Sequence, residues 1–81
     1  MILIDVSIPS LRETDNFEID EREPIGEIIE EILELAAAKS RTEVPAAREF
    51  LLTEPAGGRI FDPAKTPAEY GIANGAALLL L

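Results

Sequence analysis

Alternating apolar and polar residues open the chain and predict a β-strand. Apolar side chains occupy every second position from Ile2 to Ile8, which is the period of a strand with one buried face. After a turn-rich stretch from Pro9 to Asn16, Phe17 and Ile19 alternate with acidic residues. We therefore expect an N-terminal antiparallel hairpin whose second strand begins near Phe17.

The period changes after Pro24, where apolar residues recur at intervals of three and four. The apolar stripe consists of Ile25, Ile28, Ile29, Ile32, Leu35 and Ala36, and the other side carries Glu27, Glu30, Glu31 and Glu34. This spacing predicts an amphipathic helix from about Pro24 to Ser40. Because like charges repel at these intervals, the helix depends on packing its apolar stripe against the sheet.

Turn residues divide the rest of the chain into short strands. Val44-Pro45 ends the helical pattern, and Phe50 to Thr53 predicts a third strand. A turn containing Gly57-Gly58 follows, and Arg59 to Phe61 predicts a short return strand.

The last apolar run follows a strong turn signal. Asn74-Gly75 precedes the run from Ala76 to Leu81, which we expect to form the closing strand. The predicted order is a hairpin, a helix, two short strands and a closing strand. This order indicates one α+β domain over residues 1–81, with a mixed sheet of four or five strands and one helix packed on one face.

Composition narrows the functional classes. The chain has neither cysteine nor histidine, so it lacks thiolate nucleophiles and the commonest metal ligand and general base near neutral pH. Sixteen acidic and seven basic side chains give a formal net charge of -9, which repels nucleic-acid phosphates and anionic membranes. We therefore expect no enzyme activity, no catalytic residues, no metal or other cofactor and no nucleic-acid partner.

Hydropathy gives no sign of a membrane or export segment. The N-terminal residues lack a basic start and a long apolar core, so they do not have the pattern of a signal peptide. No apolar run approaches the roughly 20 residues that a helix needs to cross a bilayer. These features predict a cytoplasmic protein without direct membrane insertion.

The acidic residues permit two interpretations. The glutamate side of the helix is by default a solvated helix face, and the alternative is an electrostatic docking surface for a basic partner. Asp15 and Asp20 do not form a calcium loop, because Phe17 and Arg22 occupy ligand positions.

The closing segment resembles a known family. Residues 66–75, Thr-Pro-Ala-Glu-Tyr-Gly-Ile-Ala-Asn-Gly, together with the apolar strand after them, resemble the last turn and strand of ubiquitin. They are more similar to the YukD family, small ubiquitin-like proteins that accompany bacterial type VII (WXG100) secretion systems. The matching positions are Tyr70-Gly71-Ile72, Asn74-Gly75, Leu78 and Leu80. The resemblance covers essentially the whole chain and implies a ubiquitin-like β-grasp fold.

The resemblance also implies a function. It suggests a non-catalytic adaptor that binds a protein partner, namely a component or regulator of the secretion apparatus. Ubiquitin conjugation requires a flexible Gly-Gly tail, whereas this chain reaches Leu81 within a predicted strand. A covalent modifier or sulfur carrier is therefore the least favoured class. The alternative is a generic β-grasp interaction module, or an excised N-terminal ubiquitin-like domain of a larger protein.

Strand alternation predicts which residues face away from the helix. Beneath the helix it places Ile2, Ile4, Val6, Phe50, Leu52, Leu78 and Leu80, and on the opposite, open face it places Leu3, Leu51, Leu79 and Leu81. In ubiquitin the open face is the main recognition surface, so the resemblance implies that these four leucines and Leu11 in the first loop bind the protein partner. A homodimer contact and a purely structural role are the alternatives.

Overall fold

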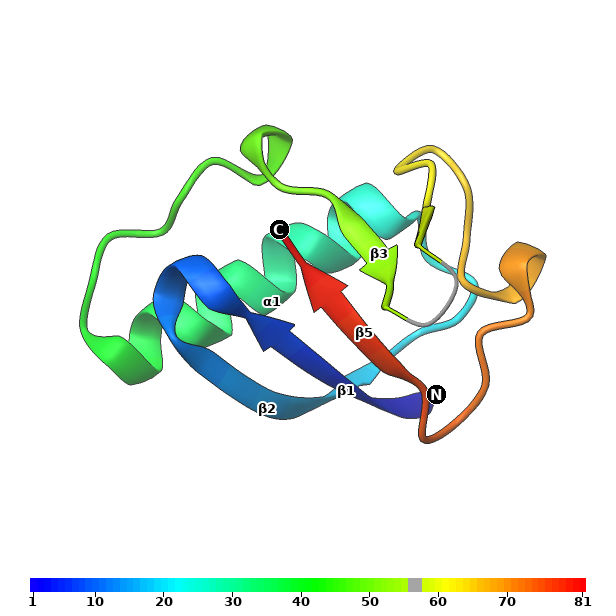
Figure 1. Ribbon diagram of the computed structural model, residues 1–81, viewed down its shortest axis with the longest axis horizontal. Coiled ribbons are helices and arrows are strands. Elements are labelled where there is room, and N and C mark those ends of the chain that lie inside the picture. Colours follow the sequence, from blue (N-terminus) through cyan, green and yellow to red (C-terminus); the bar gives the residue numbers. More distant parts are fainter. Residues whose placement is uncertain (56–57) are drawn as a thin grey trace.

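The computed structural model describes residues 1–55 and 58–81, which form a five-stranded sheet with one long helix on one face (Figure 1). The elements are β1 (Ile2–Ile8), β2 (Glu13–Ile19), α1 (Ile25–Ser40), β3 (Leu52–Glu54), β4 (Arg59–Ile60) and β5 (Ala77–Leu80). The strand order is β2-β1-β5-β3-β4. The central strands β1 and β5 are parallel, and the other pairs are antiparallel. The predicted α+β arrangement with a mixed sheet is therefore confirmed.

The core lies between α1 and the sheet. In Figure 1, α1 passes behind β1 and β5, so the opposite face of the sheet is turned toward the viewer. The sheet contributes buried Ile4, Val6, Ile8, Phe17, Ile19, Leu52, Leu78 and Leu80, and Phe61 follows directly after β4. Ile2 and Phe50 are half-buried at the edge of this core. Each fully buried Ile or Leu contributes about 1.5–3 kcal/mol, so this burial holds α1 on the sheet.

The buried side of α1 differs from the predicted stripe at one position. Its buried residues are Ile25, Ile28, Ile29, Ile32, Leu33, Ala36 and Ala37. Leu35, which we predicted within the stripe, is 61% exposed, whereas Leu33 is fully buried. At 3.6 residues per turn, Leu33 lies roughly 55° from the middle of the buried face and Leu35 roughly 105° from it. The spacing of three residues from Ile32 therefore led to Leu35, whereas the buried residue is Leu33.

The start of α1 is held by a distant part of the chain. Pro24 precedes the first helical residue rather than lying within the first turn. The Ile25 N–H donates to the Lys65 carbonyl at 2.8 Å, and the Gly26 N–H donates to the Pro63 carbonyl at 2.9 Å. The first N–H groups of a helix have no partner inside the helix. The connection after β4 supplies carbonyl partners for two of them.

β2 begins earlier than predicted. It pairs with the whole of β1, from Ile2 opposite Ile19 to Ile8 opposite Glu13. Residues 13–16, which we expected in a loop, therefore belong to the strand, and the turn is confined to the 3-10 helix η1 (Pro9–Leu11) and the residue after it. Polar residues are compatible with this part of the strand, because β2 is an edge strand whose outer positions need not be buried.

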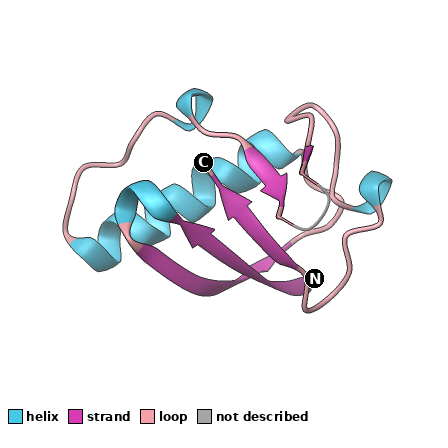
Figure 2. Cartoon of the chain, viewed as in Figure 1, coloured by secondary structure: helices cyan, strands magenta, loops and turns pink. Residues whose placement is uncertain are grey.

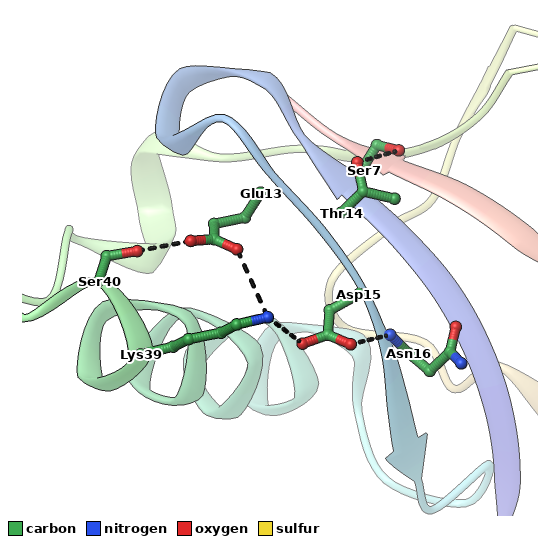
Figure 3. Close-up of polar contacts among 7 residues, drawn as sticks. All are labelled: Ser7, Glu13, Thr14, Asp15, Asn16, Lys39 and Ser40. Atoms are coloured by element: carbon green, nitrogen blue, oxygen red, sulfur yellow. Dashed lines mark hydrogen bonds and ion pairs between the residues drawn. The ribbon is translucent and has the colours of Figure 1, made fainter.

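Polar contacts join the beginning of β2 to the end of α1 (Figure 3). The Lys39 ammonium donates to Asp15 Oδ2 at 2.9 Å and lies 3.9 Å from Glu13 Oε2. The Ser40 hydroxyl donates to Glu13 Oε1 at 2.7 Å. The hydrogen bond from Lys39 is the main reason that the pKa of Asp15 is lowered, and the same bond raises the pKa of Lys39. These four residues, Glu13, Asp15, Lys39 and Ser40, are called the helix-end cluster below.

The C-terminal strands are shorter than predicted. The 3-10 helix η2 (Ala47–Glu49) precedes β3, which begins at Leu52 instead of Phe50. Another 3-10 helix, η3 (Ala68–Tyr70), lies in the connection to β5, as Figure 2 shows. Of the predicted turn, Gly57 lies outside the described residues. Gly58 has a positive φ of +66°, and its N–H donates to the Glu54 carbonyl at 2.8 Å.

Candidate functional site

The open face of the sheet has a mostly polar middle row. Residues that lie directly opposite each other in paired strands share a face. The register therefore places in one row Thr14, Ser7, Leu79, Thr53 and Ile60. Leu79 is half-buried, and Thr53 is buried with its hydroxyl donating to the Leu79 carbonyl at 3.2 Å. At the other end of the row, the Thr14 hydroxyl donates to Ser7 Oγ at 3.3 Å (Figure 3).

Exposed apolar side chains gather at one corner of this face. Leu51 precedes Thr53 by two residues and Leu81 follows Leu79 by two, so both point to the open side. Two backbone hydrogen bonds, of 2.7 and 2.8 Å, join Leu51 to Leu81. Leu51, Leu81 and Ile60 are 48%, 52% and 57% exposed. We call Leu51, Ile60, Leu79 and Leu81 the apolar corner.

The other two predicted site residues lie outside the apolar corner. Leu3 is exposed but lies opposite Glu18, four residues along β1 from Ser7 and hence roughly 13 Å from the middle row. Its N–H donates to Asn74 Oδ1 at 2.7 Å. Leu11 lies in η1 and is half-buried against the core. The structure thus brings Leu51, Leu79 and Leu81 together and leaves Leu3 apart.

Ile60 is the member of the apolar corner that the sequence analysis missed. The signal was present, because Arg59 to Phe61 was predicted to be a strand and a buried Phe61 turns Ile60 to the opposite face. Arg59, the residue before Ile60, lies on the same side of β4 as Phe61. Its guanidinium lies 3.2 Å from Glu54 Oε2 and 5.2 Å from the centre of the Phe61 ring.

Tyr70 supports the connection that leads to β5. Its hydroxyl accepts a hydrogen bond from the Asp62 N–H at 2.9 Å, and its ring lies 4.7 Å from the Phe61 ring. The side chain is half-buried. These contacts give Tyr70 a structural role, in which a half-buried ring packs on Phe61 and its hydroxyl group has a hydrogen-bond partner.

Among the titratable groups, Glu23 has an unusual environment. A hydrogen bond shared with the Glu31 carboxyl, followed by burial, raises the pKa of Glu23 above its ordinary range. Its Oε1 atom is buried without a hydrogen-bond partner.

Nowhere in residues 1–55 and 58–81 do three or more Asp and Glu side chains gather as metal ligands. Within the same residues, α1 and the shorter helices lack the combination of length and apolarity needed to span a bilayer.

Comparisons with known proteins concern the fold and the family of the chain. The family model described as "WXG100 protein secretion system (Wss), protein YukD" matches residues 3–80. No curated protein matches the chain significantly. Among solved structures, it is similar to the N-terminal ubiquitin-like domain in the 4931431F19Rik protein, with 16% identity, a TM-score of 0.72, and coverage of 99% of this chain and 72% of that chain. It is also similar to Arabidopsis thaliana At2g32350, with 20% identity, a TM-score of 0.74, and coverage of 99% and 83%.

At such identities the two solved structures show a shared fold alone, which is ubiquitin-like in the first of them. The predicted β-grasp fold is therefore confirmed. The family model is the more specific finding, because it spans nearly the whole chain and includes the closing turn and strand. The chain belongs to the YukD family of ubiquitin-like proteins.

Proposed function

We propose that this protein is a non-catalytic adaptor of a type VII (WXG100) secretion system. It binds a protein component or regulator of that system through the apolar corner, with Leu3 and Leu11 at the periphery of the contact. The secretion link comes from the description of the family. The observation that supports the binding surface is that Leu51, Ile60 and Leu81 are each about half exposed on the open face. Leu51 pairs with Leu81, and Ile60 lies on the next strand, opposite Thr53. Exposed apolar groups that cluster in this way mark interaction sites more often than single ones do.

The proposal treats residues 1–81 as one module that acts in the cytoplasm by reversible binding. The chain has no cysteine or histidine, and a hydrolase or transferase would need an activated nucleophile or a base poised near neutral pH. Its formal net charge of -9 favours a protein partner over a nucleic acid. No cofactor is part of the proposed activity.

The proposed adaptor acts by reversible contact and not by covalent attachment. Two backbone hydrogen bonds join Leu81 to Leu51 in the sheet, where both side chains are about half exposed. A reversible contact uses these exposed leucine side chains directly, whereas covalent transfer would not need them.

The proposal is tested by recovering the tagged protein from cells that contain the secretion system and identifying bound proteins before and after a denaturing wash. We expect secretion-system proteins that disappear in the wash. Separate Ile60→Asp and Leu81→Asp variants should lose most of these partners, because each places a charge on the proposed contact surface. Leu35→Asp is the matched control, since Leu35 is exposed on the side of α1 that faces β2, away from the apolar corner.

Three results would contradict the proposal. Heavier species that survive the denaturing wash would establish covalent tagging. Recovery of this chain alone, as a dimer, would favour the homodimer alternative. Full partner recovery by both apolar-corner variants would show that the partner binds elsewhere. Circular dichroism of each purified variant checks that the lost contact does not come from a lost fold.

A further inference from the structure

A groove runs along the helix side of the molecule, between α1 and the segment over residues 44–51. Figure 1 shows this segment returning from the end of α1 toward β3. A hollow of about 490 Å³ lies at one end, with an apolar lining that includes Pro24, Ile29, Ala47, Phe50, Leu51 and Pro63. A second hollow, of about 330 Å³, continues past Val44 and Pro45. Both hollows are lined by Glu30, Ala47 and Arg48, so they adjoin each other, and together we call them the α1 groove.

Apolar surface is left open along one wall of the α1 groove. Val44 is 53% exposed in the second hollow, and Leu51 is 48% exposed in the first. Between them, Ala47 and Phe50 are half-buried, because they pack on the core from one side and face the groove from the other. A concave, partly apolar surface of this kind suits the insertion of one or two apolar side chains.

The opposite wall of the α1 groove is acidic. Glu27, Glu30 and Glu34 are spaced by three and four residues, so they follow one side of α1 over roughly 10 Å. Within the part of the chain that the structure describes, no basic side chain forms an ion pair with these three carboxylates. Arg48 is the basic residue that lines the groove.

The absence of those ion pairs distinguishes this wall from the helix-end cluster. There, Lys39 lies within ion-pair distance of both Glu13 and Asp15. In the α1 groove, like charges repel one another along the same helix, and none of the ion pairs in the described part of the chain involves them. A solvated helix face would account for the glutamates alone, but it would not account for the apolar hollows directly beside them.

We propose that the α1 groove binds a basic amphipathic segment of a protein partner. An apolar side chain of that segment enters the hollow between Phe50 and Pro63, and its lysine or arginine side chains lie against Glu27, Glu30 and Glu34. Complementary charge speeds and orients such an encounter, and the net charge of -9 repels a second copy of this chain. This inference goes beyond the proposed function, because the α1 groove lies on the helix side of the sheet. Leu51 borders both surfaces, whereas Ile60, Leu79 and Leu81 do not line the groove.

The test uses the full chain, labelled with ¹⁵N, and a synthetic twelve-residue peptide that alternates pairs of lysines and leucines. We expect the largest amide shift changes at Glu30, Ala47, Arg48 and Phe50. The combined Glu30→Lys and Glu34→Lys variant should weaken binding of the peptide by at least about tenfold, because it places like charges against the lysines.

A matched variant separates the α1 groove from general attraction to an acidic protein. Asp5→Lys with Glu18→Lys changes the net charge equally, but both residues are exposed on the open face of the sheet. This variant should bind the peptide within about twofold of the original chain, because screening limits the effect of distant charges. An equal loss in both double variants would overturn the proposal.

A second peptide tests the apolar hollow. Replacing every leucine by serine keeps the positive charge, and we expect it to bind at least about tenfold more weakly. Equal binding of the two peptides, or shift changes confined to the open face of the sheet, would overturn the proposal. The Ile60→Asp and Leu81→Asp variants should bind the leucine peptide as well as the original chain does. A wrong proposal for the α1 groove can therefore be told apart from a wrong proposal for the apolar corner.

Discussion

The two ends of α1 differ in whether their charged side chains have partners within the chain. At its C-terminal end, the helix-end cluster satisfies charges within the chain, with Lys39 bonded to Asp15 on β2. Toward its N-terminal end, Glu27 and Glu30 line an open groove whose other wall includes half-buried Phe50. Charged residues at the C-terminal end of α1 therefore stabilise the fold through contacts with β2. The glutamates toward the N-terminal end line a surface that is open to a binding partner.

The largest expected effect on stability comes from a substitution in the core, on which both ends of α1 pack. Leu80→Ala should lower the free energy of unfolding by about 2–5 kcal/mol, because Leu80 is fully buried and its truncation leaves a cavity. Leu35→Ala should change it by about 0.5 kcal/mol or less, since Leu35 is 61% exposed. Urea denaturation measures both values. A comparable loss in the two variants would show that Leu35 is packed after all.

The next prediction exchanges charges at the two ends of α1. Lys39→Glu should lower Tm by a few degrees, because it removes the contact with Asp15, places a third carboxylate beside Glu13 and puts a negative charge at the helix C-terminus. Glu30→Lys should leave Tm unchanged or raise it slightly, because it relieves repulsion along the helix. Thermal unfolding at low salt measures the difference. Equal destabilisation by both changes would remove the proposed contrast.

The smallest expected effect is a contrast in pH dependence. The pKa of Asp15 is lowered from 3.8, so its stabilising contribution is present above that value and is lost as the pH falls through the folded-state pKa. The pKa of Glu23 is raised from 4.5, so its contribution is present below that value and is lost as the pH rises through the folded-state pKa. The two groups therefore give stability curves of opposite slope.

Urea midpoints measured from about pH 3 to about pH 8 test this contrast. Compared with the original chain, Asp15→Asn should remove part of the loss on the acid side. Glu23→Gln should remove part of the decline above pH 4.5. Differences between each variant and the original chain cancel the background from the other carboxylates. A Glu23→Gln curve parallel to that of the original chain would show that this carboxyl does not hold its proton more tightly when folded.

Much of the fold was predictable because its elements have clean periods. Ile4, Val6 and Ile8 are all fully buried, as the alternation in β1 requires. The start of β2 was not predictable in the same way, because residues 13–16 are polar and are recognised as a strand only through their pairing with β1. A period reveals a strand when one face is buried, and an edge strand can lack that signal.

The candidate surfaces were predictable only in part. Alternation turned Leu51, Leu79 and Leu81 toward the open face, but it did not show that Leu3 lies far along β1 from them. The glutamate side of the helix was visible in the sequence, whereas the apolar wall beside it was not. That wall exists because residues 44–51 pack along α1, and no local pattern encodes the contact.

By itself, the sequence determined the α+β class, the inward side of most elements and the closing turn typical of the YukD family, because these features depend on residue type and local spacing. The tertiary structure decided which side chains meet. Lys39 reaches Asp15 across 24 positions of the chain, and Leu51 pairs with Leu81 at the corner of the sheet. Local backbone geometry sets a period, but only closure of the loops and packing of the shared core bring distant residues into contact.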